Sequence, residues 1–273
     1  MTAGWCEAGG VALRYRVDGE AGPWLVLVHE MGGTIETWDR VVPLLEDRFQ
    51  ILRFDMRGSG LSEKVSEGVR IEDLADDLAA LLDALAIAGP VLVAGCAVGA
   101  ALALCFAARH PARSAAVVAM NPAVGVAPAN LPGLLDRAER LRGGGTRAIV
   151  DEALEHGYPE AFRAVDPQHF AGFRARWLGN DPVSLRAQFL MLAEMNLGPA
   201  LAAIACPVLG ISGRHDPLRP TEYVREVLAA IPGSRLVVIE AGHHMADQAP
   251  AAIAGEILAF AQDLGRPWTG AAA

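Results

Sequence analysis

The chain has 273 residues, a length that fits one large domain or a core with an inserted subdomain. Apolar residues make up 52% of it and charged residues 20%, which excludes an intrinsically disordered protein. The net charge of −9 and the absence of a Lys- and Arg-rich run exclude a non-specific nucleic-acid binder.

Short apolar runs alternate with segments of helical periodicity. The predicted strands cover residues 24–29, 49–55, 91–95, 115–120, 207–212 and 235–240. The predicted helices cover residues 71–85, 98–110, 221–230 and 250–264. Continuously apolar strands that alternate with helices indicate an α/β fold, a mostly parallel sheet flanked by helices on both faces.

Residues 123–200 interrupt this alternation. They contain no convincing strand, and their helical pieces are separated by Gly143–Gly145 and by pairs such as Asp166-Pro167 and Asp181-Pro182. We therefore predict a core formed by residues 1–122 and 201–273 and a helical cap inserted as residues 123–200. The cap is expected to cover one edge of the sheet.

The cysteine spacing and the N-terminal residues indicate the cellular compartment that we expect. Four cysteines lie far apart without C-x-x-C spacing, so neither a zinc site nor a disulfide framework is indicated. The N-terminal residues lack the pattern of an export signal, and the apolar stretch 91–108 is crossed by Gly95 and Gly99. We expect a cytoplasmic protein with a small-molecule substrate and with neither nucleic acid nor membrane as a partner; a homodimer is one possible assembly.

The strongest local motif is Gly95-Cys96-Ala97-Val98-Gly99, between a predicted buried strand and a predicted helix. Small residues four positions apart allow the tight strand-to-helix turn of a nucleophile elbow, in which the middle residue is normally the nucleophile. That residue is Ala97, which has no lone pair to donate. The neighbouring Cys96 is more simply a buried apolar residue, because a one-residue shift would put Val98 where a small residue is needed.

The other members of a catalytic triad follow later strands. Asp216 lies just after the strand that ends at residue 212, and His243 follows the next one. The order position 97, Asp216, His243 is the nucleophile–acid–histidine order of a hydrolase triad. His244 is the alternative base.

A glycine-containing loop follows the first buried strand. Its sequence is His29-Glu30-Met31-Gly32-Gly33. In a hydrolase, the backbone amides of Met31 and Val98 would form the oxyanion hole. Neither this loop nor the elbow matches a phosphate-binding pattern, so we expect no nucleotide cofactor, and we assign no metal ligand.

Taken together, these motifs resemble the α/β-hydrolase superfamily over nearly the whole chain, with an inserted helical cap. The matching segments are His29–Gly33, Phe54–Ser62, Gly95–Gly99, Asp216–Leu218 and Gly242-His243 with Pro250. Less specific segments are similar to the branch that contains 3-oxoadipate enol-lactonases and related small-ester, lactone and amide hydrolases: Arg142–Val150, Phe162–Ala164 and Leu201–Pro207. This chain departs from the pattern at Glu30, usually Gly, and at Ala97, usually Ser.

Ala97 allows two explanations. In the first, which we favour, the natural protein is a serine-type hydrolase with Ser at position 97, changed to Ala to trap a complex, and the chain as written is inactive. In the second, the chain is a non-hydrolytic ligand-binding protein, or a cofactor-free oxygenase or lyase that uses the His243–Asp216 pair alone.

The resemblance implies that the cap and the adjacent loops line the substrate pocket. Candidate substrate-binding residues are His29, Glu30, Met120, Trp177, Phe189, Met195 and His244. Glu30 would place a carboxylate near the pocket mouth or pair with an arginine. A substrate carboxylate could be met by the cap arginines Arg137, Arg140, Arg174 and Arg176.

Overall fold

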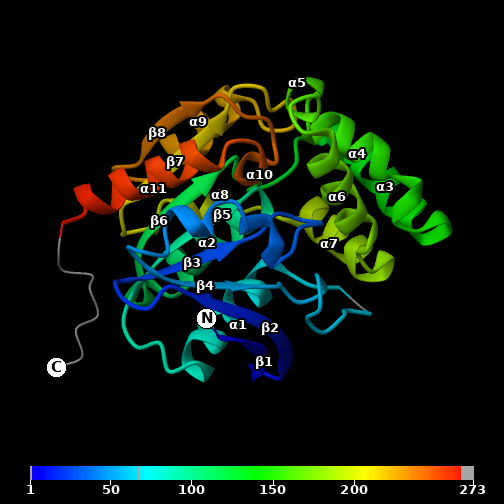
Figure 1. Cartoon of the computed structure of the whole chain (residues 1–273). Helices are drawn as coiled ribbons and strands as arrows, with labels where there is room; N and C mark the ends of the chain where they lie inside the picture. The colour runs from blue at the N-terminus through cyan, green and yellow to red at the C-terminus, as the bar shows by residue number, and fades with distance from the viewer. Residues whose placement is uncertain (1, 67, 266–273) are drawn as a thin grey trace.

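A computed structural model describes residues 2–66 and 68–265. It contains an eight-stranded sheet of order β1-β2-β4-β3-β5-β6-β7-β8 (Figure 1). The strands are β1 Thr2–Ala8, β2 Val11–Asp18, β3 Trp24–Val28, β4 Gln50–Phe54, β5 Val91–Cys96, β6 Ser114–Met120, β7 Val208–Gly213 and β8 Arg235–Ile239. From β4 to β8 across the sheet every neighbouring pair is parallel, which confirms the predicted mostly parallel α/β sheet.

The first two strands form an antiparallel hairpin that the sequence analysis missed. β1 pairs with β2, and β2 joins the sheet by an antiparallel pairing with β4. Gly9 and Gly10 connect the two strands with φ values of 60° and 83°. A two-residue Gly-Gly loop with positive φ at both positions is a strong hairpin signal, because its backbone twist matches that of the strands it joins.

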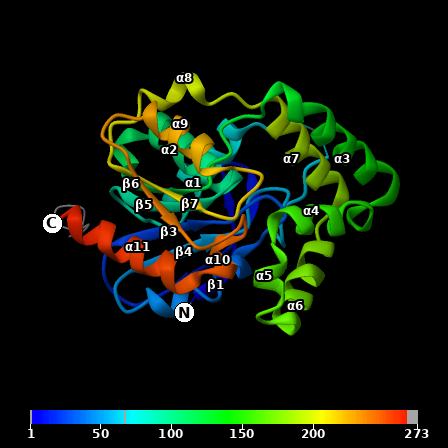
Figure 2. The same cartoon turned by 90° about the horizontal axis from the view of Figure 1, so that it is seen from above.

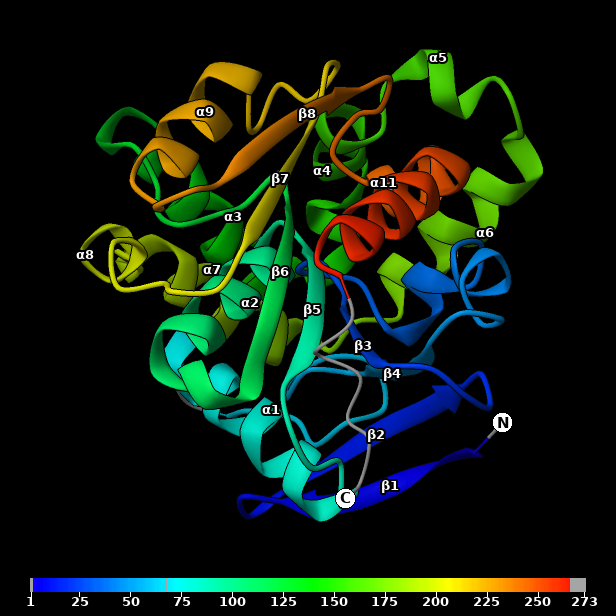
Figure 3. The same ribbon diagram turned by 90° about the vertical axis from the view of Figure 1, so that its left-hand side faces the viewer.

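Helices cover both faces of the sheet (Figures 2 and 3). On one face lie α1 Ile71–Ala84, α2 Val98–Arg109 and α9 Thr221–Ala229, and on the other lies α11 Pro250–Asp263. The buried side chains form two apolar clusters, one on each face. Leu78 and Phe106 belong to the first cluster, and Ile253 and Phe260 belong to the second. The helical periodicity read from the sequence therefore placed these four helices within one or two residues of their bounds.

A helical segment between β6 and β7 lies at one end of the sheet (Figures 1 and 2). Its helices are α3 Leu131–Gly144, α4 Val150–Gly157, α5 Glu160–Arg163, α6 Pro167–Leu178 and α7 Pro182–Glu194, followed by α8 Gly198–Leu201. Short 3-10 turns occur at Ile35–Trp38, Val42–Leu44, Pro111–Arg113, Pro128–Asn130 and Thr146–Ala148, and α10 is the short helix Met245–Gln248.

Polar contacts bind this helical segment to the core. The Tyr158 hydroxyl donates to Oδ2 of Asp247 at 2.7 Å, and the Asn180 side chain donates to the Gly32 carbonyl at 2.8 Å. Both contacts are buried, so their loss would leave polar groups unpaired. Within residues 2–66 and 68–265, no helix has both the length and the apolar character needed to cross a membrane.

Candidate active site

The turn between β5 and α2 has the geometry of a nucleophile elbow. Ala97, its middle residue, has φ 50° and ψ −109°, a conformation that L-residues other than glycine rarely adopt. A Cβ on Gly95 would overlap the Gly99 backbone, and a Cβ on Gly99 would overlap the backbone of Val28 and His29. The two glycines are therefore needed for the turn, which holds residue 97 at the carboxyl end of the central strand.

Cys96 lies on the far side of this turn. Its side chain is buried, and its Sγ is 3.8 Å from the Sδ of Met120. Burial raises the pKa of the Cys96 thiol well above its ordinary value, so the thiol does not ionise near neutral pH. Cys96 is thus a core residue. Met120 shares this packing and is not in contact with the cavity described below, so its prediction as a substrate-binding residue is wrong.

His243 and Asp216 are brought together by the loops that follow β8 and β7. Nδ1 of His243 lies 2.7 Å from Oδ2 of Asp216. The other carboxylate oxygen, Oδ1, accepts from the backbone amides of Leu218 and Arg219 at 2.8 and 3.2 Å. Burial pushes the pKa of Asp216 upward, but the charge and hydrogen bond of His243 and these two amides outweigh it and lower the pKa. The carboxylate therefore stays ionised, and it orients the ring so that Nδ1–H is the donor.

Asn121 holds the two loops in position, a role that the sequence analysis did not assign. It follows β6, is fully buried and has φ 43°. Its Oδ1 accepts from the amide of Gly213 at 3.0 Å, and its Nδ2 donates to the carbonyl of Gly242 at 3.3 Å. One side chain thus joins the end of β7 to the turn before His243. Asn directly after a predicted strand was the available signal, because Asn adopts positive φ more readily than most residues.

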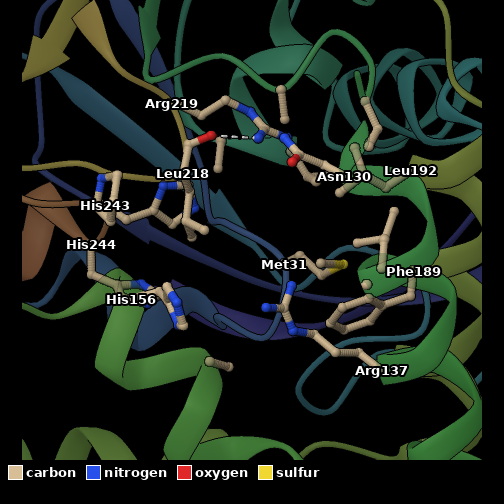
Figure 4. Close-up of a pocket in the computed structure, with 18 of the residues that line it drawn as sticks. Met31, Asn130, Arg137, His156, Phe189, Leu192, Leu218, Arg219, His243 and His244 are labelled. Atoms are coloured by element: carbon tan, nitrogen blue, oxygen red, sulfur yellow. Dashed lines mark hydrogen bonds between the residues drawn. The ribbon is translucent and has the colours of Figure 1, made fainter. Parts of the chain in front are cut away.

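A cavity of about 420 Å³ separates the sheet from the helical segment (Figure 4). Its core side includes Met31, Ala97, Val98, Pro217, Leu218, Arg219, His243 and His244. Its helical side includes Ala123, Val126, Ala129, Asn130, Gly133, Leu134, Arg137, Ala153, His156, Trp177, Phe189 and Leu192. Figure 4 shows the three histidines gathered on one side and Arg137 with Phe189 on the other. None of the described lining residues is acidic.

Met31 and Val98 line the cavity from the loop after β3 and from the first residue of α2. Within the described part of the chain, neither backbone amide has a hydrogen-bond partner. The first amides of a helix lack intrahelical acceptors and favour negative charge nearby. Both N–H groups are thus available next to residue 97.

His29 does not reach the cavity, contrary to the prediction that it binds substrate. It is fully buried. Its Nδ1 donates to the Glu30 carbonyl at 2.7 Å, and its Nε2 accepts from the Met56 amide at 3.0 Å. These two bonds fix the neutral tautomer. His29 therefore shapes the loop that carries Met31 rather than contacting a ligand.

Glu30 is also placed differently from the prediction. It is 2% exposed, is not among the residues that line the cavity, and pairs with no arginine of the described residues. Its Oε1 is 3.2 Å from Nδ1 of His244. The Glu30 side chain is buried because Glu30 begins a tight turn. In this turn the Gly33 amide donates to the Glu30 carbonyl, and Gly33 packs against the Glu30 carboxylate.

The remaining predicted pocket residues divide in two. The cavity lining includes Trp177, Phe189, His244 and Arg137. Met195 lies outside the cavity and is buried beside Gly125. The other three cap arginines contact protein groups: Arg140 pairs with Glu152, Arg174 with Asp151, and Arg176 approaches Asp247 and Phe173. Two further lining residues, Arg219 and His156, were not predicted, because periodicity does not say which loop or helix side chains face inward.

Within residues 2–66 and 68–265, no group of three or more His, Cys, Asp and Glu side chains is arranged to hold a metal ion. What the cavity does bring together is an oriented imidazole, two free backbone amides and the elbow residue. With a hydroxyl at the elbow, such an arrangement can transfer an acyl group.

Comparison with known proteins places this geometry in context. Residues 23–148 match the family model described as alpha/beta hydrolase fold. The chain is 27% identical to 3-oxoadipate enol-lactonase 2 of Acinetobacter baylyi over 234 residues, covering 85% of this chain and 86% of that protein. It is 30% identical to the RutD protein of Pantoea ananatis, named a carbamate hydrolase, over 230 residues, 81% of this chain and 82% of that protein.

Solved structures agree with the sequence relatives. The enol-lactonase from Burkholderia xenovorans LB400 superposes with a TM-score of 0.90 at 29% identity, over 95% of this chain and 100% of that one. Both the fold and the relatives found by sequence therefore point to one group of proteins, and the chain belongs to the α/β-hydrolase fold family.

Proposed function

We propose that this chain is built to bind a small carboxylate-bearing ester, lactone or amide and to hydrolyse it by acyl transfer, and that its machinery lacks only the hydroxyl at position 97. The observation that carries the proposal is the 2.7 Å contact between His243 and Asp216 at the wall of a cavity that also contains Ala97. The relatives named as an enol-lactonase and a carbamate hydrolase support cleavage of an acyl C–O or C–N bond.

With a serine at position 97, the roles follow from the geometry. Nε2 of His243 accepts the hydroxyl proton as the oxygen attacks the substrate carbonyl, and Asp216 stabilises the imidazolium that forms. The Met31 and Val98 amides donate to the developing oxyanion, and each hydrogen bond stabilises the transition state by about 3–4 kcal/mol. Water then cleaves the acyl intermediate with the same histidine as base.

With Ala97, the chain retains the cavity, the free amides and the imidazole. We expect it to bind the substrate and to turn it over slowly, with water in place of the hydroxyl, because removal of one triad member leaves the oxyanion hole and the binding energy in place. The intact His243–Asp216 pair also favours a second candidate, proton transfer by this pair alone, as in a cofactor-free oxygenase or lyase.

The charge of the cavity indicates the substrate class. Its described lining contains Arg137 and Arg219 together with three histidines, and no carboxylate, in a chain whose net charge is −9. Arg137 already pairs with Glu152, whereas no acidic side chain of the described residues pairs with Arg219. A carboxylate on the substrate would meet a guanidinium without a competing anion.

The test is the Ala97→Ser substitution, assayed with p-nitrophenyl acetate and a panel of small lactones. We expect kcat/KM to rise by at least about 10³-fold, and a further His243→Gln change to remove the gain. No gain on any substrate would contradict the hydrolytic proposal. Turnover by the Ala97 chain that needs His243 and is not raised by serine would favour the second candidate. Saturable binding without turnover in either form would indicate a ligand-binding protein.

A further inference from the structure

A second histidine–carboxylate pair lies beside the first. His244 follows His243 directly, and its Nδ1 is 3.2 Å from Oε1 of the buried Glu30. The two imidazole rings are 5.5 Å apart at an angle of 84°, and both line the cavity. In each pair the carboxylate is next to Nδ1, so Nε2 is the ring nitrogen that remains for a group bound in the cavity.

Glu30 is short of partners. Oε1 also accepts from the Thr37 hydroxyl at 3.4 Å, but the buried Oε2 has no hydrogen-bond partner among the described residues. The neighbouring His29 makes no hydrogen bond to this carboxylate, because both of its ring nitrogens are bonded to backbone groups. A buried carboxylate is costly unless a positive charge compensates it, and among the described residues His244 is the ionisable group that hydrogen-bonds Glu30.

The ionisation of Glu30 is consistent with this. Burial would raise the pKa of Glu30, but the hydrogen bond and charge of His244, with smaller contributions from a backbone hydrogen bond and from His29, outweigh burial and lower the pKa to about 2. The other nearby acid, Asp247, is taken by the hydroxyl of Tyr158 and by Nε2 of His169. The negative charge that faces His244 is thus that of Glu30.

Nε2 of His244 is free of hydrogen bonds to the described residues. The ring is held edge-on against Phe173 at 4.8 Å. Gly157 packs against this edge of the ring: a Cβ at position 157 would lie 2.7 Å from Nε2, so any larger residue there would displace the imidazole. Because Glu30 holds Nδ1, Nε2 is the ring nitrogen of His244 that remains for a group bound in the cavity.

We infer that His244, charge-balanced by Glu30, is a second acid–base residue of the cavity, which donates a proton to the leaving group while His243 accepts one from the nucleophile. This inference rests on the proposed function. It differs from a single-histidine triad, in which one ring both takes and gives the proton. The division of acid and base between two separate titratable groups is a recurring arrangement in acid–base catalysis.

The proton balance closes over one acyl transfer. The nucleophile oxygen bonds to the carbonyl carbon, and its proton passes to Nε2 of His243. The bond from that carbon to the leaving oxygen breaks, the electron pair stays on this oxygen, and the oxygen takes the proton from Nε2 of His244. The two rings return to their starting states when His243 releases a proton to water and His244 takes one up.

The kinetic test compares two acetate esters in the Ala97→Ser background. p-Nitrophenolate leaves without protonation, whereas the alkoxide of ethyl acetate needs an acid. We expect a further His244→Gln change to lower kcat/KM for ethyl acetate by at least about 100-fold and that for p-nitrophenyl acetate by less than about threefold. Glu30→Gln should act in the same direction, and His110→Gln, at a surface pair with Asp76, should change neither ester.

Equal losses on both esters, in chains that remain folded by circular dichroism, would overturn the inference while leaving the hydrolytic proposal intact. Absence of any serine-dependent turnover would contradict the hydrolytic proposal instead. The protonation of His244 can then be read without activity, from imidazole ¹⁵N NMR of the unchanged chain at pH 7. We expect protons on both nitrogens of His244, with one of them lost in Glu30→Gln, and a neutral ring in the unchanged chain would overturn the inference.

Discussion

His243 and Asp216 are 27 residues apart in the chain, and their side chains meet at 2.7 Å between Nδ1 and Oδ2. Neither residue belongs to a helix or strand, so the contact depends on the loops that follow β7 and β8. Asn121, from a third loop, is hydrogen-bonded to the backbone of Gly213 at the end of β7 and of Gly242 just before His243. The geometry of the pair is therefore set by its neighbours as well as by its own hydrogen bond.

Asn121→Gly should separate these contributions. Glycine tolerates the φ of 43° but removes both hydrogen bonds, which leaves a buried amide and a buried carbonyl unpaired. We expect a loss of about 1–3 kcal/mol in the free energy of unfolding, measured in urea. In the Ala97→Ser background we also expect kcat to fall by about 10–100-fold, with a smaller change in KM. Asn121→Ala should be less stable still because of its backbone strain, and unchanged kcat in both variants would show that Asn121 does not position the pair.

The elbow glycines predict a stability difference that needs no assay of activity. Gly99→Ala would force a Cβ into the backbone of Val28 and His29, and we expect it to lower the free energy of unfolding by about 3 kcal/mol or more. Gly255→Ala is the matched control, since it lies in α11 with open space around it. That change should raise stability by about 0.5–1 kcal/mol through helix propensity. Comparable effects of the two substitutions in thermal unfolding would contradict the steric account of the elbow.

Arg219 predicts how substrate charge affects affinity. Its guanidinium lies over the ring of Tyr223 and donates to the Leu218 carbonyl, and Figure 4 shows it at the cavity wall. In the Ala97→Ser background, we expect Arg219→Met to raise KM about tenfold or more for the monomethyl ester of succinate. The KM for methyl butyrate should change less than about twofold. Arg225→Met, in α9, is a control outside the described cavity lining, and equal effects of Arg219→Met on both esters would exclude a carboxylate contact.

The Glu30–His244 pair predicts the acid stability of the fold. The pKa of Glu30 is lowered from an ordinary 4.5 to about 2 in the folded chain. As the pH falls, Glu30 therefore takes up a proton in the unfolded chain before it does so in the folded chain. The stabilisation is complete above about pH 4.5 and is lost as the pH falls towards 2. Across this interval we expect the unchanged chain to lose on the order of 1–3 kcal/mol more unfolding free energy than Glu30→Gln. Parallel curves in urea titrations at several pH values would show that the pair is not coupled to folding.

Periodicity and local motifs were enough to predict most of the fold. The apolar runs of β3 to β8 and the stripes of α1, α2, α9 and α11 need burial on known faces, so their order along the chain indicates the parallel sheet. The β1–β2 hairpin was missed although Gly9-Gly10 marked its turn. The apolar alternation of β1 is weak because the residues on its inner side, Gly4, Cys6 and Ala8, are small.

The candidate site was predictable in part for the same reason. Ala97, Asp216 and His243 each follow a strand of one parallel sheet, and the carboxyl ends of parallel strands lie at one edge. The sequence could not indicate the direction of side chains on loops, which depends on local turns and on the neighbours they meet.

Sequence alone therefore determined the succession of β3 to β8 along the chain, the tight turn at Gly95–Gly99 and the edge of the sheet where the reactive groups gather, because these follow from burial and from short-range sterics. Only the tertiary structure decided that His29 is buried as a loop support, that Glu30 pairs with His244, and that Arg219 rather than Arg140 lines the cavity. Such choices depend on contacts between segments far apart in the chain, and no local pattern encodes them.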